Sequence, residues 1–364
     1  MDAALSEELR QYARRALGFN LAGITAALPL EGGVRLARWL AAGAHGEMAY
    51  MARTAAVRVD PQRFLPGARS VVVVALSYHD GLALPSQHLA STVQIARYAR
   101  RRDYHHVLRR RLVTLGRFLA ARRPGCRWRV AVDTAPLLER ELAQRAGLGW
   151  IGKNTCLINR RLGSNLFLGE LVTDVELAPD PPGRNHCGRC TACLDACPTA
   201  AFPHPGFLDA RRCISYLTLE HRSAFQPHQA AAVGRHLAGC DICQDVCPWN
   251  RRAPASCDSA LATRPHLVHP TVAALALLDE PGWQQFSAGT PLRRLDFDRF
   301  SRNLAAIGEH GEGVLPRPLA EEARRPPPSR FFPTKLDTGE HKDYNNALKG
   351  AAELPREEWE NREA

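Results

Sequence analysis

CGRCTACLDACP, at residues 187–198, and CDICQDVCP, at residues 240–248, are the most informative segments of this chain. The first has the spacing Cys-x2-Cys-x2-Cys-x3-Cys-Pro, and the second repeats its last part with one cysteine fewer. Close spacing lets one loop present three thiolates to a cubane iron–sulfur cluster, while the cysteine before proline reaches a neighbouring cluster. The two segments therefore predict a bacterial-ferredoxin-like module with two four-iron–four-sulfur (4Fe–4S) clusters.

Two such clusters take eight thiolate ligands, whereas the two segments supply only seven cysteines. Cys213 is the only cysteine between them, and we assign it as the missing ligand. The first cluster is then expected on Cys187, Cys190, Cys193 and Cys247, and the second on Cys197, Cys213, Cys240 and Cys243. Zinc is the alternative, but zinc sites usually show two separated Cys-x2-Cys pairs, unlike this spacing.

The composition favours metal ligation over disulfides. The chain has 364 residues and 11 cysteines, and Arg14-Arg15 is followed by no long apolar run. We see neither an export signal nor a membrane segment, so we expect a cytoplasmic protein. The cysteines outside the motifs, Cys126, Cys156 and Cys257, are interpreted as buried small apolar residues or surface thiols.

The formal net charge of +11 suggests a polyanionic partner, of which nucleic acid is the commonest. The acidic residues concentrate in residues 331–364, so the rest of the chain is more basic still. The alternative is a protein from an arginine-rich proteome, and charge alone favours neither interpretation.

Strands mixed with helices predict an α+β first domain over residues 1–178. Residues 1–60 look helical, residues 97–123 resemble a long basic helical region, and a further helix is expected over residues 136–146. Apolar, β-branched runs predict strands at residues 70–78, 128–132 and 166–175.

The amino-acid composition changes at a proline-rich linker that begins at Pro179. We expect the ferredoxin-like domain over residues 179–255 and a helical C-terminal region over residues 256–316. Residues 317–364 are rich in proline and then acidic, so we expect a tail that is extended or disordered.

The segment from Val130 to Asn154 carries the most informative residues outside the cysteine motifs. Asp133 ends a predicted strand and precedes a helix, where a carboxyl group often faces a cleft. The alternative role is helix capping by Asp133 or Thr134, which physical reasoning alone places first. The glycine-rich loop 147–152 allows close approach to a large ligand but lacks the spacing of a dinucleotide site.

Together these motifs resemble the epoxyqueuosine reductases, which complete the queuosine modification at the wobble position of certain tRNAs. The resemblance covers about residues 1–310. It rests on both cysteine motifs and on these segments: MAYMAR at 48–53, LPG at 65–67, RYA at 97–99, DYH at 103–105, VDTAP at 132–136, GLGWIGKN at 147–154 and FLGE at 167–170.

The resemblance implies a cobalamin-binding, α/β-like reductase domain that receives electrons from two 4Fe–4S clusters. It places the family's catalytic acid on Asp133, and we expect burial to raise the pKa of that carboxyl group so that it donates a proton. The implied cofactor contacts, to cob(II)alamin, are Arg58, Lys153, Asn154, Leu157, Leu168, Ser215 and Arg222.

The implied partners are the anticodon loop of a tRNA as substrate and an external electron donor such as flavodoxin or ferredoxin. The family resemblance also suggests a monomer. Arg100, Arg101 and Arg102, beside Tyr104 and His105, are candidates for pairing with phosphates, or else form a solvated helix face.

Two other functions remain open at the level of sequence. One is a cobalamin-dependent reductase of a small molecule, similar to the reductive dehalogenases. The other is a non-enzymatic ferredoxin-type electron carrier, which leaves the residues before the clusters without a role.

Overall fold

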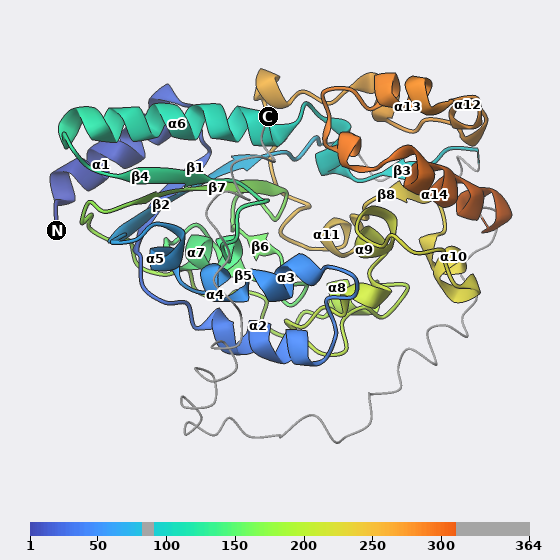
Figure 1. Cartoon of the computed structure of the whole chain (residues 1–364), viewed down its shortest axis with the longest axis horizontal. Helices are drawn as coiled ribbons and strands as arrows, with labels where there is room; N and C mark the ends of the chain where they lie inside the picture. The colour runs from blue at the N-terminus through green and yellow to red at the C-terminus, as the bar shows by residue number, and fades with distance from the viewer. Residues whose placement is uncertain (82–90, 311–364) are drawn as a thin grey trace.

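The computed structural model describes residues 1–81 and 91–310 (Figure 1). The predicted tail at residues 317–364 lies outside the described residues. The first half of the chain is built on a four-stranded antiparallel sheet in the order β1-β2-β7-β4. Its strands are β1 (Leu21–Ala26), β2 (Ser70–Ser77), β7 (Leu166–Thr173) and β4 (Trp128–Ala131).

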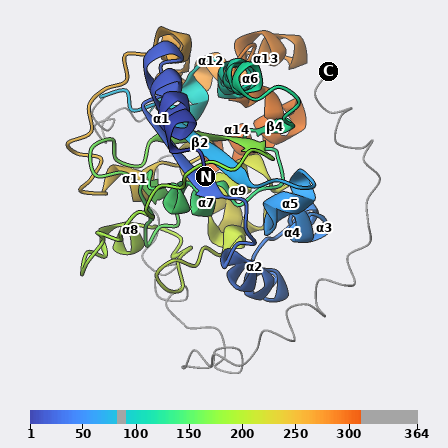
Figure 2. The same ribbon diagram turned by 90° about the vertical axis from the view of Figure 1, so that its left-hand side faces the viewer.

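Helices cover both faces of this sheet. Alternate side chains of β2 point to opposite faces, so Val72 and Val74 join one core while Val71 and Val73 join another. The first core lies under α1 (Ala3–Gln11) and α6 (Tyr104–Arg122), and the second contains residues of α7 (Glu139–Arg145). Figures 1 and 2 show α1 and α6 side by side on one face. Burial of both faces explains the unbroken apolar run of β2.

The three predicted strands are confirmed, as is the long helix within residues 97–123. The apolar residues of α6 that the sequence pattern picks out are all buried: Val107, Leu108, Leu112, Leu115 and Leu119. The predicted helix at 136–146 begins later, at Glu139, because residues 132–138 form a loop around Asp133.

The expectation that residues 1–60 are helical with loops between the helices missed β1, and Gly32 and Gly33 begin α2 instead of forming a loop. A side chain at Gly23 would collide with the backbone of Ala146, so this strand depends on a glycine, which sequence propensity disfavours in strands. The helices that follow it in the chain are α2 (Gly32–Ala41), α3 (Ala49–Arg53), α4 (Ala55–Arg58) and α5 (Pro61–Phe64).

The second half packs around its own core, which also takes in residues from the first half. The short strand β3 (Gln94–Ile95) pairs in parallel with β8 (His236–Ala238), and Val93 and Ile95 join the core that contains Trp283 and Phe300. The helices are α8 (Ala192–Asp195), α9 (Ile214–Leu219), α10 (Pro227–Val233), α11 (Ile242–Asp245), α12 (Val272–Ala276), α13 (Glu280–Phe286) and α14 (Phe297–His310).

A buried arginine ties the cysteine motifs to the first half of the chain. Arg97 is 6% exposed and forms ion pairs with Asp80, Asp241 and Asp245. Because Asp241 and Asp245 lie inside the second cysteine motif, this one guanidinium group fixes that motif against the segment that leads into α6. A further link is the hairpin of β5 (Trp150–Ile151) and β6 (Leu157–Ile158), whose Trp150 packs with Cys247.

Candidate active site

Asp133 lies in a strained loop directly after β4. Its φ is +47°, in the left-handed region that residues with a side chain seldom adopt. The backbone N–H of Asp133 donates a hydrogen bond of 2.6 Å to Oε1 of Glu139, the first residue of α7. This bond holds the loop in place, and strain of this kind is frequent at functional sites. Asp133 therefore does not cap α7.

Two cationic side chains meet the Asp133 carboxylate at the same oxygen. His105 Nε2 and Arg294 Nη1 each lie 3.0 Å from Asp133 Oδ2. His105 stands in the first turn of α6, and its Nδ1 lies 2.6 Å from Oδ1 of Asp103, the N-cap residue of that helix. The imidazole therefore bridges two carboxylates, an arrangement that favours its doubly protonated form.

The expected rise in the pKa of Asp133 is wrong for this structure. Loss of water around the carboxylate raises its pKa, but the hydrogen bond from His105 and the charge of Arg294 outweigh that effect and lower the pKa to about 2. Desolvation lowers the pKa of His105, yet hydrogen bonds to Asp103 and Asp133 raise it to about 9. At neutral pH, the proton of this pair resides on the imidazole.

Two further carboxyl groups lie behind the Asp133 loop. Glu170, on β7, is fully buried, and its two carboxyl oxygens have no hydrogen-bond partner among the described residues. Desolvation raises its pKa well above the ordinary value, and Glu139 and Asp133 add to the rise. Desolvation and the charge of Asp133 likewise raise the pKa of Glu139 to about 8. Both groups therefore favour the neutral acid form.

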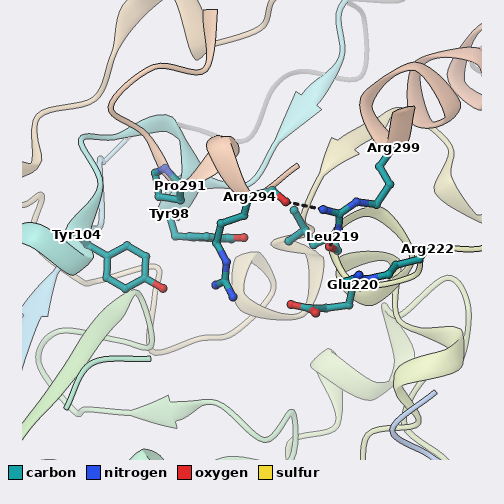
Figure 3. Close-up of a pocket in the computed structure, with 8 residues that line it drawn as sticks. All are labelled: Tyr98, Tyr104, Leu219, Glu220, Arg222, Pro291, Arg294 and Arg299. Atoms are coloured by element: carbon teal, nitrogen blue, oxygen red, sulfur yellow. Dashed lines mark hydrogen bonds between the residues drawn. The ribbon is translucent and has the colours of Figure 1, made fainter. Parts of the chain in front are cut away.

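A pocket of about 540 Å³, including the open space at its mouth, lies next to Arg294 (Figure 3). In Figure 3, Arg294 and Glu220 extend toward one another, and the Tyr104 hydroxyl points into the space. The lining residues are Tyr98, Tyr104, Leu219, Glu220, Arg222, Pro291, Arg294 and Arg299. Of the predicted cofactor contacts, Arg222 is therefore at the pocket.

The pocket also adjoins the second cysteine motif. A Cβ added to Gly239 would lie 3.4 Å from Cε1 of Tyr98, so this lining residue stands against the turn that leads into Cys240. Two lining residues thus connect the pocket to its surroundings, Arg294 to the Asp133 carboxylate and Tyr98 to the turn before a predicted cluster ligand.

The other predicted cofactor contacts fall into two groups. Arg58 is buried near the Asp133 loop, where its Nε donates to Thr54 Oγ1 at 2.8 Å and its carbonyl accepts from Leu138 N–H. Leu157 and Leu168 belong to the core beneath that loop. These three residues therefore lie near the loop that carries Asp133.

Lys153, Asn154 and Ser215 instead contact the cysteine motifs. Lys153 Nζ donates to the carbonyl oxygens of Gly188 and Cys190, each at 2.9 Å. Asn154 Nδ2 donates to the carbonyl of Cys243 at 3.3 Å. Ser215 lies in the first turn of α9, and its backbone lowers the pKa of the adjacent Cys213 thiol that burial raises.

The predicted ligands of each cluster influence one another's pKa, while their assignment to the two clusters stays a prediction. Burial, followed by the proximity of Cys247, Cys187 and Cys190, raises the pKa of Cys193 to about 11. Burial also raises the pKa of Cys240, and the nearby Cys213 and Cys197 add to the rise. The pKa of Cys243 is raised by a hydrogen bond with Cys156, by burial, and by the nearby Cys240 and Cys213.

The proposed role of Arg100 and Arg101 in phosphate contact is wrong. Arg100 is 6% exposed and Arg101 is 3% exposed, and their guanidinium groups donate to the carbonyls of Ile95 and Leu261. Neither lies on a solvated helix face. Only Arg102 of this group is exposed.

Sequence reasoning missed Arg294, Tyr98, Glu139 and Glu170 as site residues. Glu170 carries a detectable signal, because an acidic residue in the middle of an apolar strand is unusual unless it has a function. Arg294 carries none, since it reaches Asp133 across 161 residues of sequence.

Fold and site together define an oxidoreductase that receives electrons through iron–sulfur clusters. A family model described as "4Fe-4S double cluster binding domain" matches residues 186–250, and one described as "Epoxyqueuosine reductase QueG, DUF1730" matches residues 58–134. Among the residues that the model describes, no helix is long and apolar enough to cross a membrane.

An epoxyqueuosine reductase of Pseudomonas aeruginosa is 42% identical over 332 residues, which are 90% of this chain and 92% of the relative. A crystal structure of epoxyqueuosine reductase with an epoxyqueuosine-modified tRNA-Tyr stem loop matches with a TM-score of 0.77 at 31% identity, over 87% of this chain and 84% of that chain. The enzyme of Bacillus subtilis, with its aspartate catalytic loop swung out of the active site, matches with a TM-score of 0.75 at 30% identity, over 84% and 82%.

The chain belongs to the epoxyqueuosine reductase family. This placement decides between the functions that the sequence left open. The chain is an oxidoreductase of the epoxyqueuosine reductase type, in preference to a dehalogenase-like reductase or a simple electron carrier.

Proposed function

We propose that this chain reduces epoxyqueuosine to queuosine at the wobble position of tRNA, the final step of queuosine biosynthesis, with cobalamin as the reducing cofactor and Asp133 as proton donor. The observation that carries the proposal is the position of the pocket. Its lining residue Arg294 contacts the Asp133 carboxylate and its lining residue Tyr98 stands against the turn before Cys240, which supports a group bound there having a proton source and an electron source nearby.

The reaction requires two electrons and two protons. Both carbon–oxygen bonds of the epoxide break, a carbon–carbon double bond forms, and the oxygen leaves as water. The first carbon–oxygen cleavage leaves an alkoxide, which must be protonated before the oxygen departs. A general acid positioned for that transfer contributes about 10²–10⁴-fold to the rate.

The residues around the pocket suit cobalamin, a large neutral corrin with many amide groups. Its walls combine aromatic surface from Tyr98 and Tyr104 with polar groups from Glu220 and Arg222. When bound, cobalamin supplies an electron-rich cobalt centre that delivers the reducing electrons. Of the residues that would hold it, Arg222 lines the pocket, Arg58, Leu157 and Leu168 lie near the Asp133 loop, and Lys153, Asn154 and Ser215 lie at the predicted cluster ligands.

The proton is held by His105 and Asp133 as a pair. With pKa values of about 9 and about 2, the imidazole carries the proton and the carboxylate accepts its hydrogen bond at neutral pH. When the alkoxide forms, Asp133 protonates it as His105 passes its own proton to Asp133, and solvent supplies the second proton as the oxygen leaves as water. Arg294 orients the carboxylate through Oδ2 and, as a permanent cation, cannot supply that proton.

The electron path and the substrate complete the proposal. Electrons from a donor such as flavodoxin or ferredoxin enter the two 4Fe–4S clusters singly and proceed to the pocket. The substrate is the anticodon loop of a tRNA, whose unpaired base can be turned out of the loop into a pocket. We assign the catalytic acid to residues 1–178, electron transfer to residues 179–255 and completion of the pocket, through Arg294, to the helical region 256–316, in a monomer.

Anaerobic reconstitution tests the proposal. The full chain, with its clusters rebuilt and reduced, is assayed on an epoxyqueuosine-containing anticodon stem loop. The mass of the modified nucleoside is then measured by mass spectrometry. Loss of one oxygen that depends on added cobalamin supports the proposal. Conversion without cobalamin overturns the cofactor assignment, and no conversion with clusters and cobalamin both in place overturns the substrate assignment.

A further inference from the structure

Only one of the eight predicted cluster ligands, Cys190, is exposed. It belongs to the group of Cys187, Cys190, Cys193 and Cys247, so this first cluster lies nearer the surface than the second. The second group neighbours buried residues instead, among them Asn154 and Asp241, and borders the pocket. Electrons that travel toward the pocket therefore enter at the first group.

Three loops meet around the first group, at residues 159–165, 183–191 and 248–254. The Trp150 ring packs edge-on against His186 and Trp249, with centroids 5.1 and 5.3 Å away, and its Nε1 donates to Cys187 Sγ at 3.3 Å. Asn250 Oδ1 accepts from the backbone of Ser164 at 2.6 Å. These contacts place the three loops side by side at the first cluster.

The three loops are strongly and uniformly basic. They contain no Asp or Glu, and their arginines are all exposed: Arg160, Arg161, Arg184, Arg189, Arg251 and Arg252. Among the described residues, none of these six guanidinium groups forms a hydrogen bond or an ion pair with another group of the chain. We call these three loops the arginine face.

We propose that the arginine face is the docking surface for an acidic, one-electron carrier protein that reduces the first cluster. The proposal rests on the electron route of the proposed function and adds the place and chemistry of the partner. Unpaired arginines around a half-buried Trp249 and an exposed Pro248 match the pattern of interfaces, where aromatic and arginine side chains dominate binding. Each encounter oxidises the carrier by one electron and reduces the cluster by one, without any change in bonds or protons.

An RNA backbone is the other polyanion that such a surface could attract. The position of the arginine face argues against it, because none of the eight residues lining the pocket belongs to the three loops. The base to be reduced must reach Asp133, whereas the arginine face surrounds the cluster farther from the pocket.

Charge reversal tests the docking surface. The variant Arg251→Glu/Arg252→Glu is compared with Arg110→Glu/Arg117→Glu, which makes the same charge change on the exposed side of α6, across the sheet from the cysteine motifs. Reduced flavodoxin, a strongly acidic flavin protein, is the probe, and cluster reduction is followed by stopped-flow absorbance without RNA or cobalamin. Dithionite reduction and iron content report whether the clusters are intact.

We expect the second-order rate constant for reduction by flavodoxin to fall about tenfold or more in the arginine-face variant. The salt dependence of this rate constant should also weaken, because electrostatic steering raises association rates by about 10–10³-fold. Binding of oxidised flavodoxin, measured by calorimetry, should weaken in parallel, while the α6 variant and dithionite reduction stay unchanged. Equal flavodoxin rates in the two variants overturn the proposal, as does a selective loss of stem-loop binding in the arginine-face variant. Because cluster reduction is measured without substrate, these outcomes are separate from failure of the proposed reaction.

Discussion

His105 Nε2 lies 3.0 Å from Asp133 Oδ2, and the same imidazole contacts Asp103 through its other nitrogen. The helix that carries His105 packs on the sheet that contains the strand before Asp133, so the core helps to set the position of the pair. Through this contact, the Asp133 carboxylate, whose own pKa is low, forms a pair with His105 that holds one transferable proton at neutral pH.

The pH dependence of turnover should report the proton on His105. Because its pKa is raised to about 9, the pair keeps its proton below that pH and loses it above, so kcat should fall tenfold per pH unit above about 9. His105→Gln should have a lower kcat throughout and lack this alkaline limb. A wild-type rate that is flat to above pH 10, with clusters intact, would contradict the assignment.

Replacement of Glu139 by glutamine should change how stability depends on pH. The folded-state pKa of Glu139, about 8, lies above its ordinary value of 4.5, so the folded chain holds this proton more tightly than the unfolded chain. Stability from this group is therefore lost as pH rises from about 4.5 to 8. The melting temperature of Glu139→Gln relative to wild type should increase between pH 5 and pH 8.

Two controls sharpen the Glu139 experiment. The glutamine oxygen can still accept the Asp133 N–H, whereas Glu139→Ala removes that acceptor and should lower activity by loosening the loop. If the difference in melting temperature between wild type and Glu139→Gln does not change with pH, the carboxyl group is not held in its neutral form.

Loss of Arg97 should destabilise the junction between the cysteine motifs and the first half of the chain. Arg97→Leu removes the cation shared by Asp241 and Asp245 inside the core, and breaking a buried ion pair costs about 3–5 kcal/mol. We expect a lower melting temperature and reduced iron content after purification. Arg293→Leu, at an exposed position, is the control and should behave as wild type, and equal effects of the two variants would refute the role of Arg97.

Much of the fold follows from local sequence patterns, and the exceptions have identifiable causes. Strand β2 and helix α6 are evident because uninterrupted apolar runs and helical spacing reflect burial directly. Strand β1 is hidden because packing against Ala146 selects a glycine where propensity would not. Arg100 and Arg101 look like surface charges because sequence does not reveal the carbonyl groups that receive them.

The functional site also contains features that the sequence predicts and features that it does not. A two-cluster domain could be predicted from motif spacing, since cluster geometry restricts how far apart neighbouring ligands can be in sequence, and the ligand set of each cluster stays a prediction. The protonation of Asp133 could not be predicted, because it depends on His105 and Arg294, which come from other parts of the chain. Burial alone would have raised the pKa, and the contacts decide the opposite direction.

The central claim is that Asp133 delivers the proton, and single-turnover kinetics of Asp133→Asn test it most directly. The amide matches the carboxylate in size but cannot act as an acid, and Thr134→Val serves as the neighbouring control. With clusters, cobalamin and the modified stem loop bound as in wild type, the account predicts a rate about 10²–10⁴-fold lower for Asp133→Asn and unchanged for the control. A wild-type rate for Asp133→Asn would contradict it.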